Sequence, residues 1–205
     1  MKDDPHALRT AADLDRLFGP VAEPSLRKEI DHLHPLYRRM IEASPFVVVA
    51  TSGPDGLDAS PRGDPAGFVV VEDDRTLLLP ERRGNNRVDS LRNLVEDPRI
   101  ALLFLIPGAG EMLRVNGRAR LTTDPVLLER LAMDGRPPRC VTVVHVERVY
   151  FQCARAVQRA GLWRPATPPP SVPSPGAILQ ALSDGEIDGA RYDEALPARQ
   201  RDTLY

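Results

Sequence analysis

The chain has 205 residues, of which 42% are hydrophobic and 27% are charged, and its formal net charge is -2. This length allows one domain with extra segments at its ends, and this composition is ordinary for a soluble globular protein. The near-neutral charge shows no basic excess of the kind that indicates nucleic-acid binding, so we expect no nucleic-acid partner.

Three further classes are excluded by what the sequence lacks. The two cysteines, Cys140 and Cys153, have neither CxxC nor Cys/His ligand spacing, so we expect reduced thiols and no metal site. The N-terminus has no apolar core of the signal-peptide type, and no stretch approaches the roughly 20 apolar residues of a membrane span. The sequence therefore predicts a cytoplasmic protein with no membrane partner.

Residues 1–43 are expected to form a helical leader. Helical spacing of apolar residues runs through 7–19 and 25–43, and Pro35 is expected to divide or kink the second helix. From Ser44 onward the sequence has runs of β-branched residues, each followed by residues that favour turns. "PFVVVATS" and "LDASPRG" predict one hairpin, "GFVVVE" and "TLLLP" a second, and "RIALLFLI" a strand buried on both faces.

Between the last two strands lies "RRGNNRVDSLRN", residues 82–93, with four arginines in twelve positions. Asn85 or Asn86 is expected to cap a helix that runs to about Glu96. Arginines at the positive end of a helix increase repulsion unless an anion binds there, so the segment predicts an anion site. The alternative is a solvated loop in which the arginines pair with Glu81 or Asp89.

The second half of the sequence continues the β pattern. "EMLRVNGRARLTT" predicts a long strand with Gly117 as a bulge or close backbone approach, followed by a helix capped by Asp124 and a last strand from about 139 to 154. Six or seven strands with few helices between them indicate an antiparallel barrel, which we assign to residues 44–165. Residues 166–205 are a proline-rich linker and a C-terminal arm, expected to pack on the body or on a second subunit.

The order and spacing of four segments resemble the pyridoxamine 5'-phosphate oxidase-like flavoproteins. They are "SPRGDPAGFV" (60–69), "DDRTLLLPERRGNNRVDSLRNLVEDPRIALLFLIPG" (73–108), "LRVNGRA" (113–119) and "FQCARAVQRAGLW" (151–163). The resemblance implies a mainly β protein with flanking helices, an antiparallel FMN-binding split barrel. It also implies a homodimer with two flavin sites at the subunit interface.

The resemblance also assigns site residues. Asn86 and Arg87 match the positions that hold the FMN phosphate, with Arg82 and Ser90 close enough to help. Arg62 matches a basic position near the phosphate or the flavin ring, although a salt bridge with Asp64 is equally consistent with the sequence. The remaining implied FMN contacts are Ser60, Gly63, Leu79, Pro80, Arg159 and Trp163, the last two from the other subunit; Trp163 is alternatively a plug at the end of the barrel.

The activity implied is FMN-dependent oxidoreduction of an unknown small molecule, with NAD(P)H or an organic substrate as electron donor. The Arg-x-His substrate motif of the pyridoxamine phosphate oxidases proper is absent, so the vitamin B6 reaction is not expected. No catalytic residue is assigned. Two alternatives remain: a non-catalytic protein that stores or senses flavin or haem, and a reductase that uses the deazaflavin F420.

Overall fold

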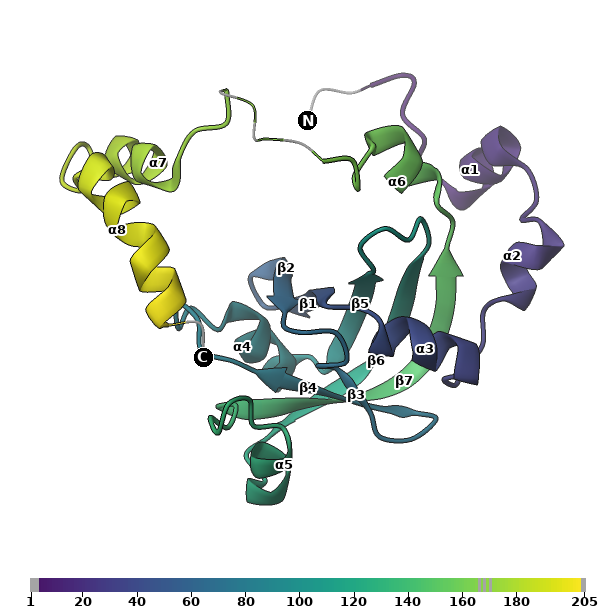
Figure 1. The fold of residues 1–205 in the computed structure, drawn as a ribbon. Helices are drawn as coiled ribbons and strands as arrows, with labels where there is room; N and C mark the ends of the chain where they lie inside the picture. Colours follow the sequence, from purple (N-terminus) through teal and green to yellow (C-terminus); the bar gives the residue numbers. More distant parts are fainter. Residues whose placement is uncertain (1–3, 166, 168, 170, 204–205) are drawn as a thin grey trace.

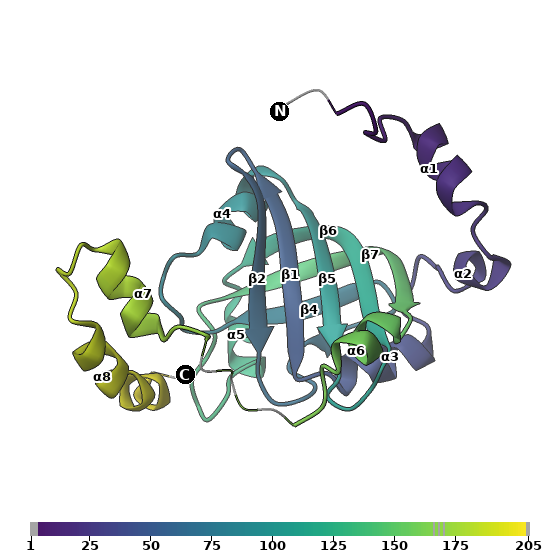
Figure 2. The same cartoon turned by 90° about the horizontal axis from the view of Figure 1, so that it is seen from above.

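The computed structural model describes residues 4–165, 167, 169 and 171–203. Its centre is a single sheet whose strands are, in chain order, β1 (Phe46–Gly53), β2 (Gly56–Gly63), β3 (Val70–Val71), β4 (Thr76–Glu81), β5 (Arg99–Leu105), β6 (Met112–Thr122) and β7 (Cys140–Gln152). Their order in the sheet is β2-β1-β5-β6-β7-β4-β3, and every neighbouring pair is antiparallel. The sheet curls strongly but remains open, with β2 and β3 as its edges (Figures 1 and 2). The predicted mainly β architecture is confirmed.

The main core fills the concave side of the sheet. Inward-facing residues of successive strands alternate with outward-facing ones, as the period of two in a β-strand requires. Phe104, Leu113 and Val47 are fully buried there. Strand β5 alternates buried and partly buried positions, so the expectation that residues 99–105 are covered on both faces is wrong. Strand β4 is covered on both faces, because Leu131, which directly follows helix α5 (Pro125–Arg130), packs with Leu78 of β4 and Val141 of β7 on the outer side.

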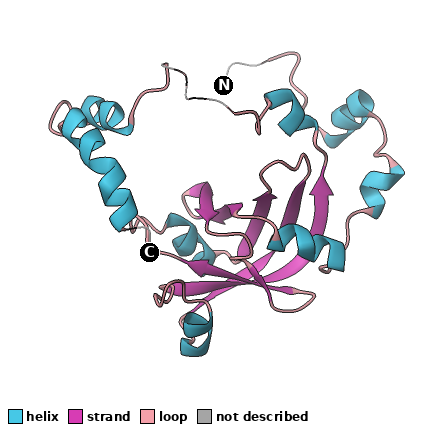
Figure 3. Cartoon of the chain, in the orientation of Figure 1, coloured by secondary structure: helices cyan, strands magenta, loops and turns pink. Residues whose placement is uncertain are grey.

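The leader forms short helices, of which the first two stand away from the sheet and the third packs against it (Figure 3). They are α1 (Ala11–Phe18), α2 (Glu23–Arg27) and α3 (Pro35–Glu42). The division of the second predicted helix at Pro35 is confirmed: Pro35 is the first residue of α3, where its missing N–H costs nothing. Between α2 and α3 the chain pairs with the sheet, since Ile30 and Val149 exchange backbone hydrogen bonds of 3.1 and 2.8 Å.

A charge pair joins the leader to the turn between β3 and β4. Arg75 Nη2 donates to Asp31 Oδ2 over 2.8 Å, and this bond lowers the pKa of Asp31 from 3.8 to about 2. Because the folded-state pKa is lowered, the pair stabilises the fold above about pH 4, and this contribution is lost as the pH falls toward 2. We expect an NMR titration to show Asp31 ionising near 2, and Arg75→Gln to return it toward 3.8. Asp97, whose pKa Arg99 also holds near 2, is the control and should not move; an unchanged Asp31 would contradict the assignment.

The predicted irregularity at Gly117 is confirmed. The β6–β7 register shifts between Asn116 and Gly117, and a Cβ atom on Gly117 would lie only 2.0 Å from the carbonyl oxygen of His145. Only glycine allows the two backbones to approach this closely at the bulge.

Gly117→Ala is therefore expected to lower the free energy of unfolding by about 1–3 kcal/mol, the usual cost of forcing extra atoms into a packed site. Urea unfolding followed by circular dichroism measures it. Gly84→Ala is the matched control, because a Cβ there meets no atom within 4 Å. Equal stability of the two variants would show that the bulge tolerates a side chain.

The remaining helices are α4 (Asp89–Glu96), α6 (Arg155–Ala160), α7 (Pro175–Leu182) and α8 (Gly189–Asp202). Helix α4 packs on β1 and β2, and α6 follows β7 directly. Helices α7 and α8 form a hairpin beyond the proline-rich segment: a Cβ on Gly176 would lie 2.0 Å from the Gly189 carbonyl oxygen, and Asp193 Oδ1 accepts from the Gly176 N–H over 2.7 Å. Packing of this arm on the body or on a second subunit stays a prediction, as do the three segment boundaries.

Candidate functional site

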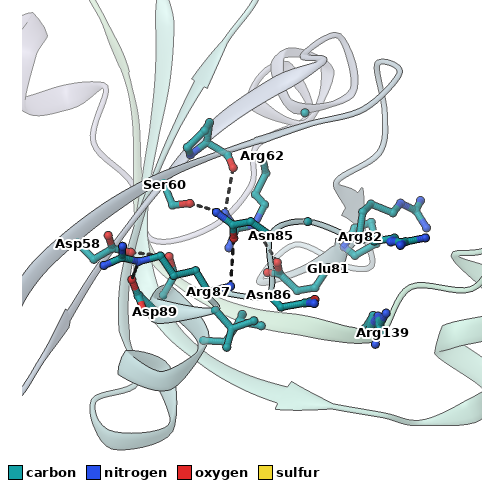
Figure 4. A pocket seen from close by; sticks show the side chains of 18 of the residues that line it. Asp58, Ser60, Arg62, Glu81, Arg82, Asn85, Asn86, Arg87, Asp89 and Arg139 are labelled. Carbon is teal, nitrogen blue, oxygen red and sulfur yellow. Dashed lines mark hydrogen bonds and ion pairs between the residues drawn. The ribbon is translucent and has the colours of Figure 1, made fainter. Parts of the chain in front are cut away.

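A cavity of about 640 Å³ lies where β2 and β4 end and α4 begins (Figure 4). Its walls come from residues 58–63 of β2, from residues 80–91, which lead from β4 into α4, and from Phe68 and Arg139. Residues 82–91 of the arginine-rich segment that the sequence singles out thus form one wall of this cavity.

The loop between β4 and α4 has an unusual backbone. Asn86 and Val88 have φ angles of 61° and 46°, and a β-branched residue with positive φ is a true outlier. The prediction that Asn85 or Asn86 caps the helix is wrong: the N-cap is Val88, without a side-chain cap, and α4 begins at Asp89. Asn85 instead accepts from the Arg87 N–H through Oδ1, over 3.0 Å, in a local turn. Such strained loops concentrate at functional sites, so the conformation favours a ligand-binding role.

A buried ion pair forms the inner wall. Arg62 Nε donates to Glu81 Oε2 over 2.8 Å, and Arg62 Nη1 donates to Ser60 Oγ over 2.7 Å. Glu81 is only 6% exposed, and its second oxygen accepts from the Thr142 hydroxyl over 2.8 Å. The alternative pairing of Arg62 with Asp64 is therefore wrong, because residues 62 and 81 face each other at the ends of their strands. Burial, followed by the Glu81 carboxylate, raises the pKa of the neighbouring Cys140 thiol, which disfavours a reactive thiolate there.

Arg82 holds the loop to the body of the protein. Its Nε atom pairs with Asp64 Oδ2 over 2.9 Å, and its Nη1 atom donates to the carbonyl of Leu131 over 2.8 Å. The Asp64 side chain is 1% exposed, so this pair is desolvated on one side. Arg82 therefore positions the loop against the end of α5, in addition to lining the cavity.

The outer end of the cavity holds polar side chains, among them the buried Ser90. Arg87 Nε donates to Asp89 Oδ2 over 2.6 Å, and the Ser90 hydroxyl donates to Asp58 Oδ2 over the same distance. The Arg87 side chain is 79% exposed. Because exposed ion pairs contribute little stability, Arg87 can exchange Asp89 for a stronger anion at small cost. The alternative of a loop arginine paired with Asp89 is confirmed for Arg87, and this exposed pair is compatible with an anion site.

The structure brings most of the assigned residues together. Those that line the cavity are Ser60, Arg62, Gly63, Pro80, Arg82, Asn86, Arg87 and Ser90. Leu79 does not, because it points into the main core and is fully buried. Arg159 is exposed on α6, and Trp163 donates its indole N–H to the carbonyl of Ala109, between β5 and β6. In this chain, both lie outside the cavity lining, so their assigned contacts require a second subunit.

Arg139 and Asp58 are among the lining residues that have no assigned role in the sequence interpretation. Arg139 precedes the last strand, and its backbone N–H donates to the Glu81 carbonyl over 3.0 Å, which brings it beside the end of β4. The sequence alone does not place Arg139 at the cavity, because its position there depends on the β4–β7 register, in which Glu81 pairs with Cys140. Asp58 is identifiable only once β2 is aligned with the start of α4.

Among the described residues, the structure shows neither a group of metal ligands nor a membrane-spanning helix. In that part of the chain, His, Cys, Asp and Glu side chains form no group of three or more suited to a metal ion. No helix within it combines the length and apolar character needed to cross a membrane.

Three solved structures that match this chain have low sequence identity to it. A proposed pyridoxamine 5'-phosphate oxidase of Lactobacillus delbrueckii has 20% identity and a TM-score of 0.48, and the match covers 59% of this chain and 95% of that one. HupZ of Group A Streptococcus has 19% identity and a TM-score of 0.47, with 57% and 90% covered. A Clostridium acetobutylicum protein related to general stress protein 26 has 18% identity and a TM-score of 0.43, with 56% and 84% covered. No curated protein matches the chain.

The family model described as pyridoxamine 5'-phosphate oxidase matches residues 33–153. This match spans more than half of the chain and takes in α3, the whole sheet and the cavity. The open, curled antiparallel sheet is the split-barrel type of fold that the sequence predicts for residues 44–165. The chain therefore belongs to the pyridoxamine 5'-phosphate oxidase family.

Proposed function

We propose that the cavity binds FMN and that the protein is an FMN-dependent oxidoreductase acting on a small molecule. The observation that carries this proposal is the polar loop wall. Asn86, Arg87 and Ser90 line one end of the cavity, next to the first turn of the eight-residue helix α4. Guanidinium, amide and hydroxyl donors beside a helix N-terminus match the needs of a phosphate monoester.

The other walls fit the rest of the cofactor. Residues 60–63 supply a strand edge that would face the ring, and Pro80 would lie along the ribityl chain. Gly63 is not required by crowding, since a Cβ there would make ordinary contacts at 3.5 Å. The volume, about 640 Å³, is within the usual range for cofactor and small-ligand sites.

Bound FMN would supply the redox chemistry, accepting a hydride or electrons from NAD(P)H or an organic substrate and passing them to oxygen or another acceptor. The chain's own part is to bind and orient the cofactor and to set the charge around it. Arg62 is held in place by Ser60 and Glu81, and the Glu81 carboxylate offsets its positive charge. Its influence on a reduced, anionic ring is therefore smaller than that of an unpaired arginine. In a homodimer, Arg159 of the second subunit would supply the less compensated charge.

A second candidate is a protein that binds a flavin or haem without turnover. The residues that line the cavity include no histidine, cysteine, tyrosine or lysine, so among described residues its acid-base groups are three carboxylates and the arginines. This observation favours storage or sensing over proton-transfer chemistry.

Anaerobic mixing of the flavin-loaded protein with NADH or NADPH separates the two candidates. Loss of the visible flavin absorbance within seconds to minutes, and its return when air is admitted, is the expected result for an oxidoreductase. An absorbance that persists with both nucleotides, although dithionite bleaches it, would refute nicotinamide-dependent oxidoreduction and support the binding role. Parallel reconstitution with F420 tests the remaining alternative.

A further inference from the structure

A second hollow, of about 400 Å³, lies on the outer face of the sheet, over β4, β6 and β7. Its lining residues are Thr76, Arg118, Ala119, Arg120, Val143 and His145, and none of them lines the larger cavity. Residues next to them along the strands, such as Leu77 and Val144, belong to the main core on the concave side. The hollow therefore lies on the opposite side of the sheet from the core and is separate from the proposed FMN site.

The strand register brings the polar side chains of this hollow together. Arg118 of β6 is paired with His145 of β7, which is in turn paired with Thr76 of β4. Residues directly opposite each other in an antiparallel pair have Cβ atoms about 5 Å apart. Arg120 lies two residues beyond Arg118, so it projects from the same face of β6, and both arginines are exposed. The hollow therefore has a row of three polar side chains across three strands, with a second arginine beside it.

The two arginines of the hollow have no carboxylate partner. In the part of the chain that the structure describes, neither guanidinium takes part in a hydrogen bond or an ion pair. Three arginines on neighbouring segments are all paired: Arg75 with Asp31, Arg99 with Asp97 and Arg130 with Glu72. The lack of a partner at Arg118 and Arg120 therefore does not reflect a shortage of acidic residues around the hollow.

Two carboxylates interact with this group through space, and both have closer partners. Hydrogen bonds from Arg99 hold the pKa of Asp97 at about 2, and the charge of Arg118 makes the smallest contribution. A backbone N–H lowers the pKa of Asp73 most, and the charge of His145 lowers it least. These carboxylates therefore compensate the positive charge of the hollow only weakly.

This arrangement of charges favours a bound anion. Arg118 is paired with Arg99 of β5 and lies two residues from Arg120, and like charges on one face of a sheet repel one another and destabilise it. An anion in the hollow would remove this repulsion while it accepts hydrogen bonds from the planar guanidinium groups. A long polyanion would need an extended basic track, whereas the arginines around the hollow are already paired. The charge pattern thus fits a small anion.

We propose that this hollow binds the phosphate group of a small soluble molecule. Arg118 and Arg120 supply the charged donors, and His145 and Thr76 supply further hydrogen-bonding groups beside them. Val143 gives the hollow an apolar wall for the carbon part of the ligand. Binding here does not require flavin in the larger cavity, so the protein has two separate sites for phosphate-bearing molecules.

NMR of the full-length, ¹⁵N-labelled protein tests this site. Inorganic phosphate and, separately, glycerol 3-phosphate are titrated with FMN present and with FMN absent. The backbone amide signals of residues 118–120 and 143–145 are expected to shift until they saturate, and glycerol 3-phosphate should bind at least as tightly as inorganic phosphate because Val143 contacts its carbon chain. Arg118→Gln/Arg120→Gln should weaken both affinities at least tenfold, the order expected when charge-assisted hydrogen bonds are lost.

Two further variants make the test specific. Arg39→Gln/Arg92→Gln removes the same charge at exposed arginines outside the hollow, and should change either affinity less than about twofold. Arg118→Lys/Arg120→Lys keeps the charge and should lose less affinity than the glutamine variant. Since both arginines of the hollow are exposed, these variants are expected to keep the fold, which far-UV circular dichroism checks.

Several outcomes would overturn the second site. They are amides that do not shift, equal affinities in wild type and Arg118→Gln/Arg120→Gln, and equal weakening by the two glutamine double variants. Shifts confined to residues 80–91 would place the phosphate in the larger cavity, which overturns the second site and leaves the FMN proposal standing. A short single-stranded DNA, or vesicles containing phosphatidic acid, that shift the same amides at a lower phosphate concentration than glycerol 3-phosphate would overturn the assignment to a small soluble molecule.

Discussion

Glu81→Ala is expected to lower the free energy of unfolding by about 3 kcal/mol, because it leaves the Arg62 guanidinium without its partner in a largely buried wall. The Arg62 side chain is 20% exposed and that of Glu81 is 8% exposed, so water replaces the lost carboxylate poorly. The substitution also removes the acceptor of the buried Thr142 hydroxyl. Urea unfolding followed by circular dichroism measures the loss.

Two variants make this test specific. Glu72→Ala removes a carboxylate that pairs with Arg130 at the surface, where both side chains are more than a third exposed, and it should cost less than about 1 kcal/mol. Arg62→Met/Glu81→Leu should recover most of the stability, since replacing a buried pair by apolar groups is often neutral. If Glu81→Ala and Glu72→Ala cost the same, the pair does not support the cavity wall.

Arg87→Gln is expected to weaken FMN binding about tenfold, the effect of losing one charge-assisted hydrogen bond to a phosphate. Asp89→Asn should have the opposite effect, because it frees the guanidinium that Asp89 holds at 2.6 Å before the phosphate arrives. Fluorescence titration of the apoprotein with FMN measures both affinities.

Arg92→Gln is the matched control for Arg87→Gln, since Arg92 is exposed on α4 and does not line the cavity. It changes the net charge by the same amount as Arg87→Gln. The FMN affinity should stay within about twofold, because salt and water screen an exposed charge that does not contact the phosphate. Equal weakening by Arg87→Gln and Arg92→Gln would indicate a diffuse charge effect and would contradict direct contact with the phosphate.

The strands were predictable from the sequence because their signals are local. Alternating or continuous β-branched runs bounded by Gly, Pro and Asp place both hairpins, and a single glycine marks the β6 bulge where only a missing Cβ allows the backbones to meet. Membership of the family was recognisable for the same reason: its segments keep their order along the chain, whatever their contacts in space.

The partners of the charged residues were not predictable, because they depend on which strand ends meet. Arg62 has Asp64 two residues away in the sequence but pairs with Glu81, which the fold of β2 and β4 brings opposite. Asp64 pairs with Arg82 for the same reason. The start of α4 was also predicted wrongly. Asparagine is a preferred N-cap residue, so Asn85 or Asn86 was expected there, but the loop takes positive φ at Asn86 and Val88 and the helix starts after Val88.

The central claim is that the cavity between β2, β4 and α4 holds FMN. The visible absorption spectrum of the protein as purified, followed by mass identification of the molecule that heat releases, tests it most directly. The account predicts a yellow protein that releases FMN at close to one molecule per chain. A colourless protein that also fails to take up added FMN would contradict it. The arginine-rich loop would then be a solvated helix start without a phosphate ligand.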